Sequence, residues 1–323
     1  MSWLIWRQHR KQALFTLAAL GALAALMVPT GLTMHAKYDS LGLGACRAAL
    51  GSASMITQTE AVARCESLGH QLQQEFGGMV FIAVLFVVLP VLVGVFFGAP
   101  LVAREVEHGT HRLVWTQGVT RLQWALAKFG LVGAITAVLA VGYALGVSWW
   151  FEPLVSTSVG RLTYLSFDVQ GVVPIAYTLF ALALGVFAGT YWRKVLPAMG
   201  IALVGFAAVR VAVEVLARPR YLPARTLSFS PDGRQTPNPA SGDWVLDLGV
   251  RNAAGEMVLP NAQIGPCPPG GCGDTSAGPG AANWLQYQPG DRFWIFQGIE
   301  TGLFVLLAAA LVFFALRRLR TIA

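Results

Sequence analysis

Long stretches without a charged residue constrain this chain more than any other feature. A helix that crosses the roughly 30 Å hydrocarbon layer of a membrane needs about 20 mostly apolar residues. Stretches of this length, four of them free of Asp, Glu, Lys and Arg, occupy residues 12–35, 76–103, 129–151, 169–192, 195–217 and 293–316. We therefore expect an all-α polytopic membrane protein with six transmembrane helices.

The composition agrees with a membrane protein and excludes other classes. Of the 323 residues, 55% are hydrophobic and 12% are charged, against about 25% charged residues in soluble domains. A soluble domain cannot bury so much apolar surface, and disorder requires the opposite composition. The net charge of +7 does not indicate nucleic-acid binding, because the basic residues flank the apolar stretches. The first stretch is too long for a signal peptide, so we expect it to be retained.

The distribution of Lys and Arg predicts the orientation in the membrane. Short cytoplasmic connections are rich in these residues, whereas long translocated loops count little. The basic short pieces are an N-terminal interfacial helix at 1–11, the segment 104–128, the turn 193–194 and the tail 317–323. The longer loops at 36–75, 152–168 and 218–292 mix basic with acidic residues. Both termini are therefore predicted to be cytoplasmic.

The four cysteines lie in two of the predicted outer loops. Cys46 and Cys65 share the first loop, and Cys267 and Cys272 share the last. Four cysteines permit three pairings, of which the local one needs the least rearrangement of the chain. A zinc site is the alternative, but neither pair has a His at ligand spacing. Because disulfides are the expected state outside the membrane, we predict two local disulfides and no metal.

The last outer loop, 218–292, is rich in Pro and Gly, yet it contains one regular pattern. Residues 243–250 and 256–260 flank a turn at 252–255 and predict a small hairpin. The loop is interpreted either as a gate over an exit path or as a cover pinned by a disulfide. Both interpretations stay open at this point.

The connection 104–128 contains signals for a short helix at the membrane surface. Gly109-Thr110 can end one helix and cap the next, and Thr120 can cap the helix that enters span three. Between them, Leu113 begins a short apolar patch. Such a helix suits contact with a soluble partner, or it lies on lipid headgroups.

This connection resembles the coupling-helix segment of ABC-2 type exporter permeases. The resemblance rests on Glu105-x-Glu107-x-Gly109-Thr110, then Leu113, then Thr120-Arg121 and Lys128. In that family the segment docks into a groove of a separate ATPase. The residues that the resemblance assigns to coupling are Glu105, Glu107, Gly109, Thr110, Leu113 and Arg121. The chain departs from the family at Gly118-Val119, where many members have a Pro.

The resemblance also implies the partners. Two ATPase subunits would hold the ATP and magnesium, and the permease would form a homodimer or pair with a paralogous permease in a bacterial cell membrane. The chain has no Gly-x4-Gly-Lys-[Ser/Thr] loop, so we expect no enzymatic activity and no cofactor of its own. Apolar walls favour an amphipathic or hydrophobic cargo, such as a drug-like molecule, a lipid or a peptide. A non-pumping anchor or sensor whose outer loop binds a ligand is the alternative, and a membrane enzyme ranks last.

Charges and small residues inside the spans complete the predicted site. Arg210 and Glu214 are four residues apart on one helical face and can pair. Glu300 can meet Arg210 if the last two spans are antiparallel. These charges belong either to a transport path or dimer interface, or to structural pairing.

Three spans also contain Gly-x3-Gly spacings, which allow helices to approach closely. The spacings are Gly94/Gly98, Gly142/Gly146 and Gly185/Gly189. Pro90 is expected to kink the second span, because it lacks a backbone donor and its ring clashes with the preceding turn.

Overall fold

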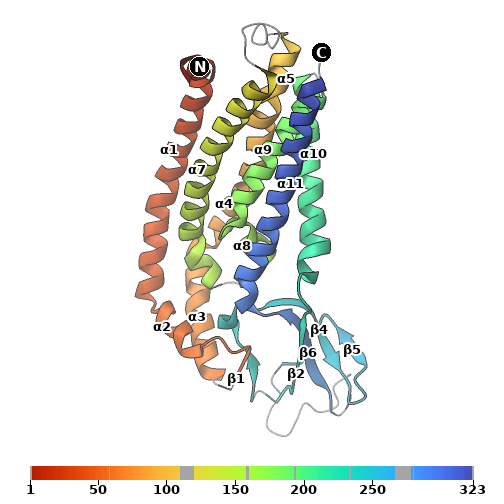
Figure 1. Cartoon of the computed structure of the whole chain (residues 1–323). Helices are drawn as coiled ribbons and strands as arrows, with labels where there is room; N and C mark the ends of the chain where they lie inside the picture. Colours follow the sequence, from red (N-terminus) through yellow and green to blue (C-terminus); the bar gives the residue numbers. More distant parts are fainter. Residues whose placement is uncertain are drawn as a thin grey trace.

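The computed structural model of the chain is a bundle of long helices with a small β-sheet at one end (Figure 1). It describes residues 2–57, 59–109, 120–157, 160–192, 194–232, 234–265, 278 and 280–321. Helix α1 (Ser2–Ser40) begins, and helix α11 (Phe293–Thr321) finishes, at the end opposite the sheet. We call that end the terminal end, and the end with the sheet the cap end.

Within the part of the chain that the structure describes, five helical segments are long and apolar enough to cross a membrane. They are Glu60–Glu107, Arg121–Ser156, Val173–Tyr191, Val195–Arg220 and Gly290–Arg320. The chain is therefore a multi-pass membrane protein. The predicted first span, 12–35, lies within α1, but many side chains in the first half of α1 are outside the described ones. Six spans and the membrane orientation thus stay predictions.

The predicted second span, 76–103, belongs to one nearly continuous helical rod that begins before the span. Its parts are α3 (Thr59–Phe76), η1 (Gly77–Met79), α4 (Val80–Val93), the π-turn η2 (Gly94–Gly98) and α5 (Ala99–Glu107). Pro90 has no N–H to donate to the carbonyl of Phe86, four residues earlier. The hydroxyl of Tyr143, from the neighbouring helix α7 (Arg121–Ser156), donates to that carbonyl across 2.7 Å. A neighbouring span thus replaces the bond that Pro90 removes.

Helix α9 (Val173–Tyr191) is the central helix of the bundle. Helices α4, α5, α7, α11 and α10 (Val195–Ala212) all pack against it, and most of its side chains are buried. After α10 the chain continues through a second π-turn, η3 (Val213–Ala217), and a short 3-10 turn, η4 (Arg218–Arg220). The short helix α8 (Tyr164–Val169) leads into α9 at the cap end.

Two of the predicted glycine pairs pack against each other. A Cβ on Gly185 would collide with the Gly94 carbonyl oxygen, and a Cβ on Gly98 would come within 2.6 Å of the Leu182 carbonyl oxygen. The second span therefore touches α9 backbone to backbone. The third pair behaves differently, because no described atom lies within 4 Å of a Cβ placed on Gly142.

The helices contain two separate large hydrophobic cores. The first core lies around Phe180 and Phe304 and joins α9, α10 and α11 with α8 and the inner part of α4. The second core lies around Phe86 and Trp150 and joins α1, α4 and α7 with Val169 of α8, so that α8 contributes to both cores. The bundle thus consists of two packed groups of helices that meet along the second span.

The segment 218–292, predicted as the last outer loop, contains a four-stranded antiparallel sheet rather than a lone hairpin. The strand order is β2 (Arg225–Phe229), β6 (Ala282–Gln288), β4 (Trp244–Arg251) and β5 (Met257–Pro260). Strands β4 and β5 pair as the predicted hairpin. The sequence signal misses the rest, because β2 and β6 lie far apart in the chain and neither is joined to its neighbour by a tight turn. We call residues 225–288 the cap.

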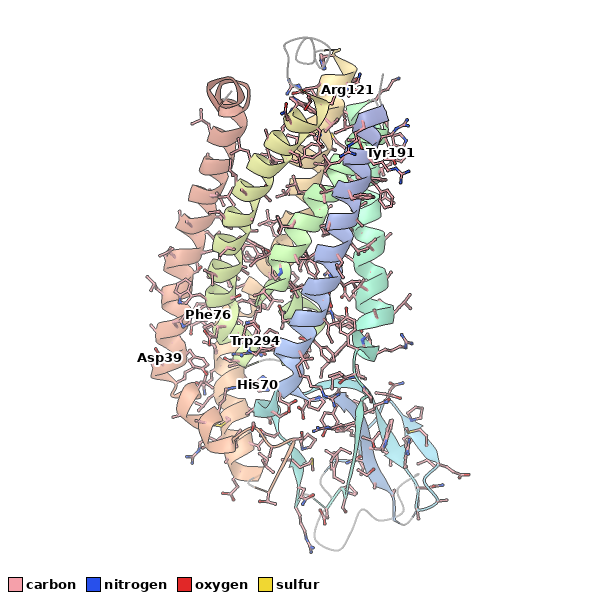
Figure 2. All side chains as sticks on the ribbon, viewed as in Figure 1. Asp39, His70, Phe76, Arg121, Tyr191 and Trp294 are labelled. Carbon is pink, nitrogen blue, oxygen red and sulfur yellow. A yellow bond between two sulfur atoms is a disulfide. The ribbon has the colours of Figure 1, made fainter. Side chains whose placement is uncertain are left out.

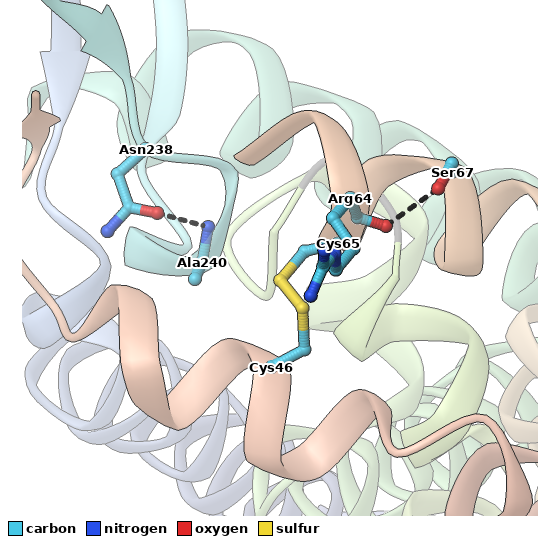
Figure 3. Close-up of a disulfide and its surroundings, with 6 residues drawn as sticks. All are labelled: Cys46, Arg64, Cys65, Ser67, Asn238 and Ala240. Atoms are coloured by element: carbon cyan, nitrogen blue, oxygen red, sulfur yellow. Dashed lines mark hydrogen bonds between the residues drawn. A yellow bond between two sulfur atoms is a disulfide. The ribbon is translucent and has the colours of Figure 1, made fainter. Parts of the chain in front are cut away.

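The predicted first outer loop forms a helical platform beside the cap, made of α2 (Leu43–Leu50) and α3 (Figure 1). A disulfide joins Cys46 of α2 to Cys65 of α3, with the Cα atoms 5.8 Å apart (Figure 3). Half of the predicted cysteine pairing is therefore present. Cys267 and Cys272 lie outside the described residues. A two-stranded sheet, β1 (Met55–Ile56) with β3 (Thr236–Pro237), connects the platform to the cap.

Candidate functional site

The predicted coupling segment begins where α5 ends, at the terminal end of the bundle. The amide of Gly109 donates to the Val106 carbonyl across 3.2 Å, and Gly109 has a φ of +69°. Glycine adopts this left-handed conformation without strain and commonly closes a helix. Gly109 therefore ends the helix, as the sequence indicates. Thr110 and Leu113 lie outside the described residues, so their part in coupling stays a prediction.

The segment finishes at the first turn of α7. Thr120 caps this helix: its hydroxyl accepts the Gln123 amide, and the Gln123 side chain accepts the Thr120 amide, each across 3.2 Å. Such a reciprocal capping box fixes the start of a helix. Arg121 follows as the first residue of α7 and lies at the terminal end (Figure 2). The coupling segment therefore lies between two defined points, the end of α5 at Gly109 and the start of α7 at Thr120.

Glu105 ties the end of α5 to α7. Its carboxylate forms an ion pair with the Lys128 ammonium, which also lies 5.1 Å from the centre of the Trp124 ring. Lys128 is 9% exposed, so this ammonium is largely removed from water and depends on its partners.

Glu107 ties the same helix end to α10. Its carboxylate accepts a hydrogen bond from the Val195 amide across 2.9 Å. Val195 is the first residue of α10, where the backbone amides lack partners within the helix. A negative charge at this position is also favoured by the helix dipole. The two acids of the predicted motif therefore connect the second span to two other spans of the same chain.

Two of the three predicted intramembrane charges, Arg210 and Glu300, lie in one buried cluster at the cap-end half of the bundle. We use the name charge cluster for six side chains from five segments: Asp168, Tyr177, Arg210, Arg218, Tyr221 and Glu300. Arg218 and Glu300 are fully buried, and Asp168 and Arg210 are 5% exposed. Two guanidinium groups therefore balance two carboxylates away from water.

Arg218 lies at the centre of the charge cluster. It donates to both oxygens of Glu300, at 3.0 and 2.9 Å, and to Asp168 Oδ1 at 2.7 Å. Its guanidinium carbon also lies 4.2 Å from the centre of the Phe167 ring. Tyr221 donates to Glu300 Oε2 across 3.1 Å. Burial and the negative charge of Glu300 raise the pKa of Tyr221, so this hydroxyl stays a donor.

Arg210 contacts both acids from the other side. It forms ion pairs with Asp168 and, across 3.5 Å, with Glu300, and it lies over the Tyr177 ring at 3.8 Å. The predicted contact with Glu214 is longer, 3.9 Å, and that side chain is 24% exposed. Glu214 therefore stands at the edge of the charge cluster.

Sequence reasoning missed Asp168 and Arg218. Both stand directly beside an apolar stretch, so a boundary drawn at the first charged residue assigns them to loops. In a regular α-helix, residues eight positions apart are about 80° from alignment. The π-turn η3 uses more residues for one revolution and brings Arg218 to the same side as Arg210. The sequence signal that could have found Asp168 and Arg218 is their position, since each is a charged residue at the edge of an apolar stretch.

Comparison with known proteins gives one match. The family model described as "ABC-2 membrane transporter related" matches residues 17–218, more than half of the chain. No curated protein and no solved structure matches. The matched residues include the coupling segment and most of the charge cluster, and they end before the cap.

Proposed function

The chain belongs to the ABC-2 membrane transporter related family, and from this premise we propose that it is the permease subunit of an ATP-driven exporter in a bacterial cell membrane. The family points to a permease component that works with a separate ATPase. In this proposal two copies of that ATPase hold the ATP and magnesium, and two permease subunits form the path. An amphipathic or hydrophobic cargo, such as a drug-like molecule, a lipid or a peptide, leaves between them.

One observation carries the proposal: the helix end that precedes the coupling segment is bonded to two other spans. Glu105 pairs with Lys128 of α7, and Glu107 accepts the first amide of α10. A push on the segment therefore moves α5, α7 and α10 together. A segment that only rested on lipid headgroups would not need these connections.

The packing of the helices indicates how a movement at the coupling segment reaches the rest of the protein. The second span lies backbone to backbone against α9 through Gly94 and Gly185. Helix α10 runs from Val195, whose amide donates to Glu107 at the terminal end, to Arg210 near the cap end. Closure of the ATPase pair at the terminal end thus reaches the outer half of the bundle through packed helices.

The test is co-purification with the ATPase encoded nearest to this chain, with ATP hydrolysis as the second measurement. We expect a stable complex with wild-type permease. The Glu105→Ala/Glu107→Ala variant should still insert into the membrane but lose most of the hydrolysis that depends on the complex. Glu66→Ala, which changes an exposed acid of the platform, is the matched control and should behave as wild type.

Other outcomes discriminate between the proposals. If no ATPase associates with wild-type protein, the exporter proposal fails, and a membrane anchor or sensor becomes the better explanation. If the complex forms and the double variant hydrolyses ATP like wild type, Glu105 and Glu107 are not part of coupling.

A further inference from the structure

Helix α11 exposes one continuous face from the middle of the bundle to the terminal end. In an α-helix, residues four positions apart lie on the same face, one above the other. The exposed side chains of α11 between residues 305 and 318 recur as pairs at this spacing: Val305 and Leu306, Ala309 and Ala310, Phe313 and Phe314, and Arg317 and Arg318. The face is therefore apolar along its length and basic at its end. We call these eight residues the α11 face.

Aromatic side chains flank the basic end of the α11 face. The Arg318 guanidinium carbon lies 5.5 Å from the centre of the Tyr191 ring, at the end of the neighbouring helix α9 (Figure 2). Tyr191 and Trp192 are each 42% exposed. Exposed Tyr and Trp rings are common where the apolar layer of a membrane meets the lipid headgroups. These rings therefore place Arg317 and Arg318 at the level of the headgroups.

The terminal end carries a large excess of positive charge. The four predicted cytoplasmic pieces together hold twelve Lys and Arg residues but only two acids. Both acids have partners within the chain, since Glu105 pairs with Lys128 and Glu107 accepts the Val195 amide. Arg317 forms no hydrogen bond or ion pair with the part of the chain that the structure describes. Its charge is thus available to an anion outside the chain.

An anionic phospholipid matches both parts of the α11 face. Its phosphate accepts hydrogen bonds from guanidinium groups, whose planar fork suits phosphate oxygens. Basic residues at the membrane surface attract lipids of this charge. Its acyl chains can lie along the apolar part of the face, which continues from the basic end toward the middle of the bundle. The order of basic and apolar residues on α11 is therefore the order of headgroup and chain in such a lipid.

Two other occupants fit the α11 face less well. A soluble partner such as an ATPase can reach the basic end, but not Phe313 and Phe314, which lie one turn deeper in the candidate span Gly290–Arg320. A second copy of this chain, related by a two-fold axis through the membrane, would present its own Arg317 and Arg318 at the same depth. Like charges would then meet across the interface, which is unfavourable.

We propose that the basic end of the α11 face, together with Tyr191 and Trp192, is a binding site for an anionic phospholipid. The lipid phosphate contacts Arg317 and Arg318, and an acyl chain lies along the apolar residues that precede them. The bound lipid joins the end of α9 to the end of α11. The inference needs only a chain that lies in a membrane, so it does not depend on the proposed export.

Native mass spectrometry of the full chain in detergent counts bound lipids and measures their affinity. The probes are dioleoylphosphatidylglycerol, which is anionic, and dioleoylphosphatidylcholine, which has the same chains and no net charge. We expect wild type to bind the first phosphatidylglycerol about tenfold more tightly than phosphatidylcholine, as the attraction of two surface cations implies. Arg317→Gln/Arg318→Gln should lose most of this preference. Arg317→Lys/Arg318→Lys keeps both charges and should retain most of it.

Two further variants separate the parts of the site. Arg225→Gln/Arg234→Gln is the matched control, because it removes two exposed guanidinium groups from the cap and changes the net charge equally. It should bind both lipids like wild type. Phe313→Ala/Phe314→Ala should weaken both lipids by a similar factor, because it removes apolar contact area without changing the charge. Glycerol phosphate, an anionic headgroup without chains, should not displace the bound lipid.

Three results would overturn the proposal. In the first, the cap control loses the preference as far as Arg317→Gln/Arg318→Gln does, so that net charge alone attracts the lipid. In the second, Arg317→Gln/Arg318→Gln keeps the preference but no longer binds the ATPase, which would assign the basic end to the soluble partner. The third concerns the melting temperature of Arg317→Gln, which should equal that of wild type without lipid and rise less when phosphatidylglycerol is added. An equal fall in both conditions would assign Arg317 to the packing of α11.

Discussion

The carboxylate of Glu107 accepts a hydrogen bond from the backbone amide of Val195 across 2.9 Å, so the last residue of α5 caps the first residue of α10. The two residues are 88 positions apart in the chain. This contact joins a motif acid to the start of a span that leads to the charge cluster. It gives the coupling segment a mechanical connection that its own sequence does not reveal.

Glu107→Ala removes both the acceptor and the charge from this helix start. We expect a loss of about 1–2 kcal/mol of unfolding free energy. Glu107→Gln should lose less, because its side-chain oxygen still accepts the amide. Thermal unfolding of the purified protein in detergent measures both. Glu66→Ala changes an exposed acid on the platform and should leave the melting temperature unchanged. An equal loss in that control would show that the effect is not specific to the hydrogen bond between Glu107 and the first amide of α10.

Gly185→Val should be one of the most damaging single substitutions in the chain. A Cβ at this position collides with the backbone of Gly94, so the second span and α9 must separate. We expect a loss of at least about 3 kcal/mol, or no folded protein. Gly142→Ala is the matched substitution, since its Cβ meets no described atom within 4 Å. It should raise stability by up to about 1 kcal/mol. Expression level and melting temperature report both effects.

The charge cluster should show strong coupling between its members. Arg218→Met leaves Asp168 and Glu300 buried without their central partner, at a cost of about 3–5 kcal/mol. Adding Glu300→Gln removes one of the stranded charges, so the double variant should be more stable than the sum of the two single losses predicts. Unfolding midpoints of the four proteins give the coupling energy. Simple additivity would contradict the ion-pair assignment.

The extent of sequence-based prediction differs between features that depend on neighbouring residues and features that depend on contacts far apart in the chain. Gly109, Thr120 and the β4–β5 hairpin follow from local signals, and the structure confirms each of them. Local signals suffice there, because a helix end or a tight turn depends only on a few neighbouring residues. The long apolar stretches likewise predict helices from their own length.

Other parts depend on contacts that no local pattern encodes. The charge cluster needs Asp168 and Arg218, which the edges of apolar stretches conceal. It also needs the π-turn η3, whose position follows from tertiary packing rather than from residue preference. Asn238 lies in a Pro-rich stretch that reads as an ordinary turn, yet it binds carbonyls almost two hundred residues away, at Leu50 and its neighbours.

The cysteine pairing gives a covalent test of the outer loops. Peptide mapping by mass spectrometry without reduction should find Cys46 linked to Cys65, and we expect Cys267 linked to Cys272. Replacing Cys46 and Cys65 by Ser should cost about 2–4 kcal/mol. Protease cleavage within α2 and α3 should then increase, while cleavage in the cap stays as in wild type. A linkage between the two loops would contradict the local pairing.

The bond from Tyr143 to the carbonyl of Phe86 exists because Pro90 cannot make it. Tyr143→Phe leaves that carbonyl without its donor, at a cost of about 1 kcal/mol. In a Pro90→Ala background the new amide at position 90 can donate to Phe86, so the same substitution should cost much less. The difference between the two losses, measured by thermal unfolding, isolates this one contact. An unchanged loss in the Pro90→Ala background would mean that the Tyr143 hydroxyl stabilises the bundle independently of the backbone donor that Pro90 lacks, because Tyr143→Phe keeps the ring that packs against Phe86.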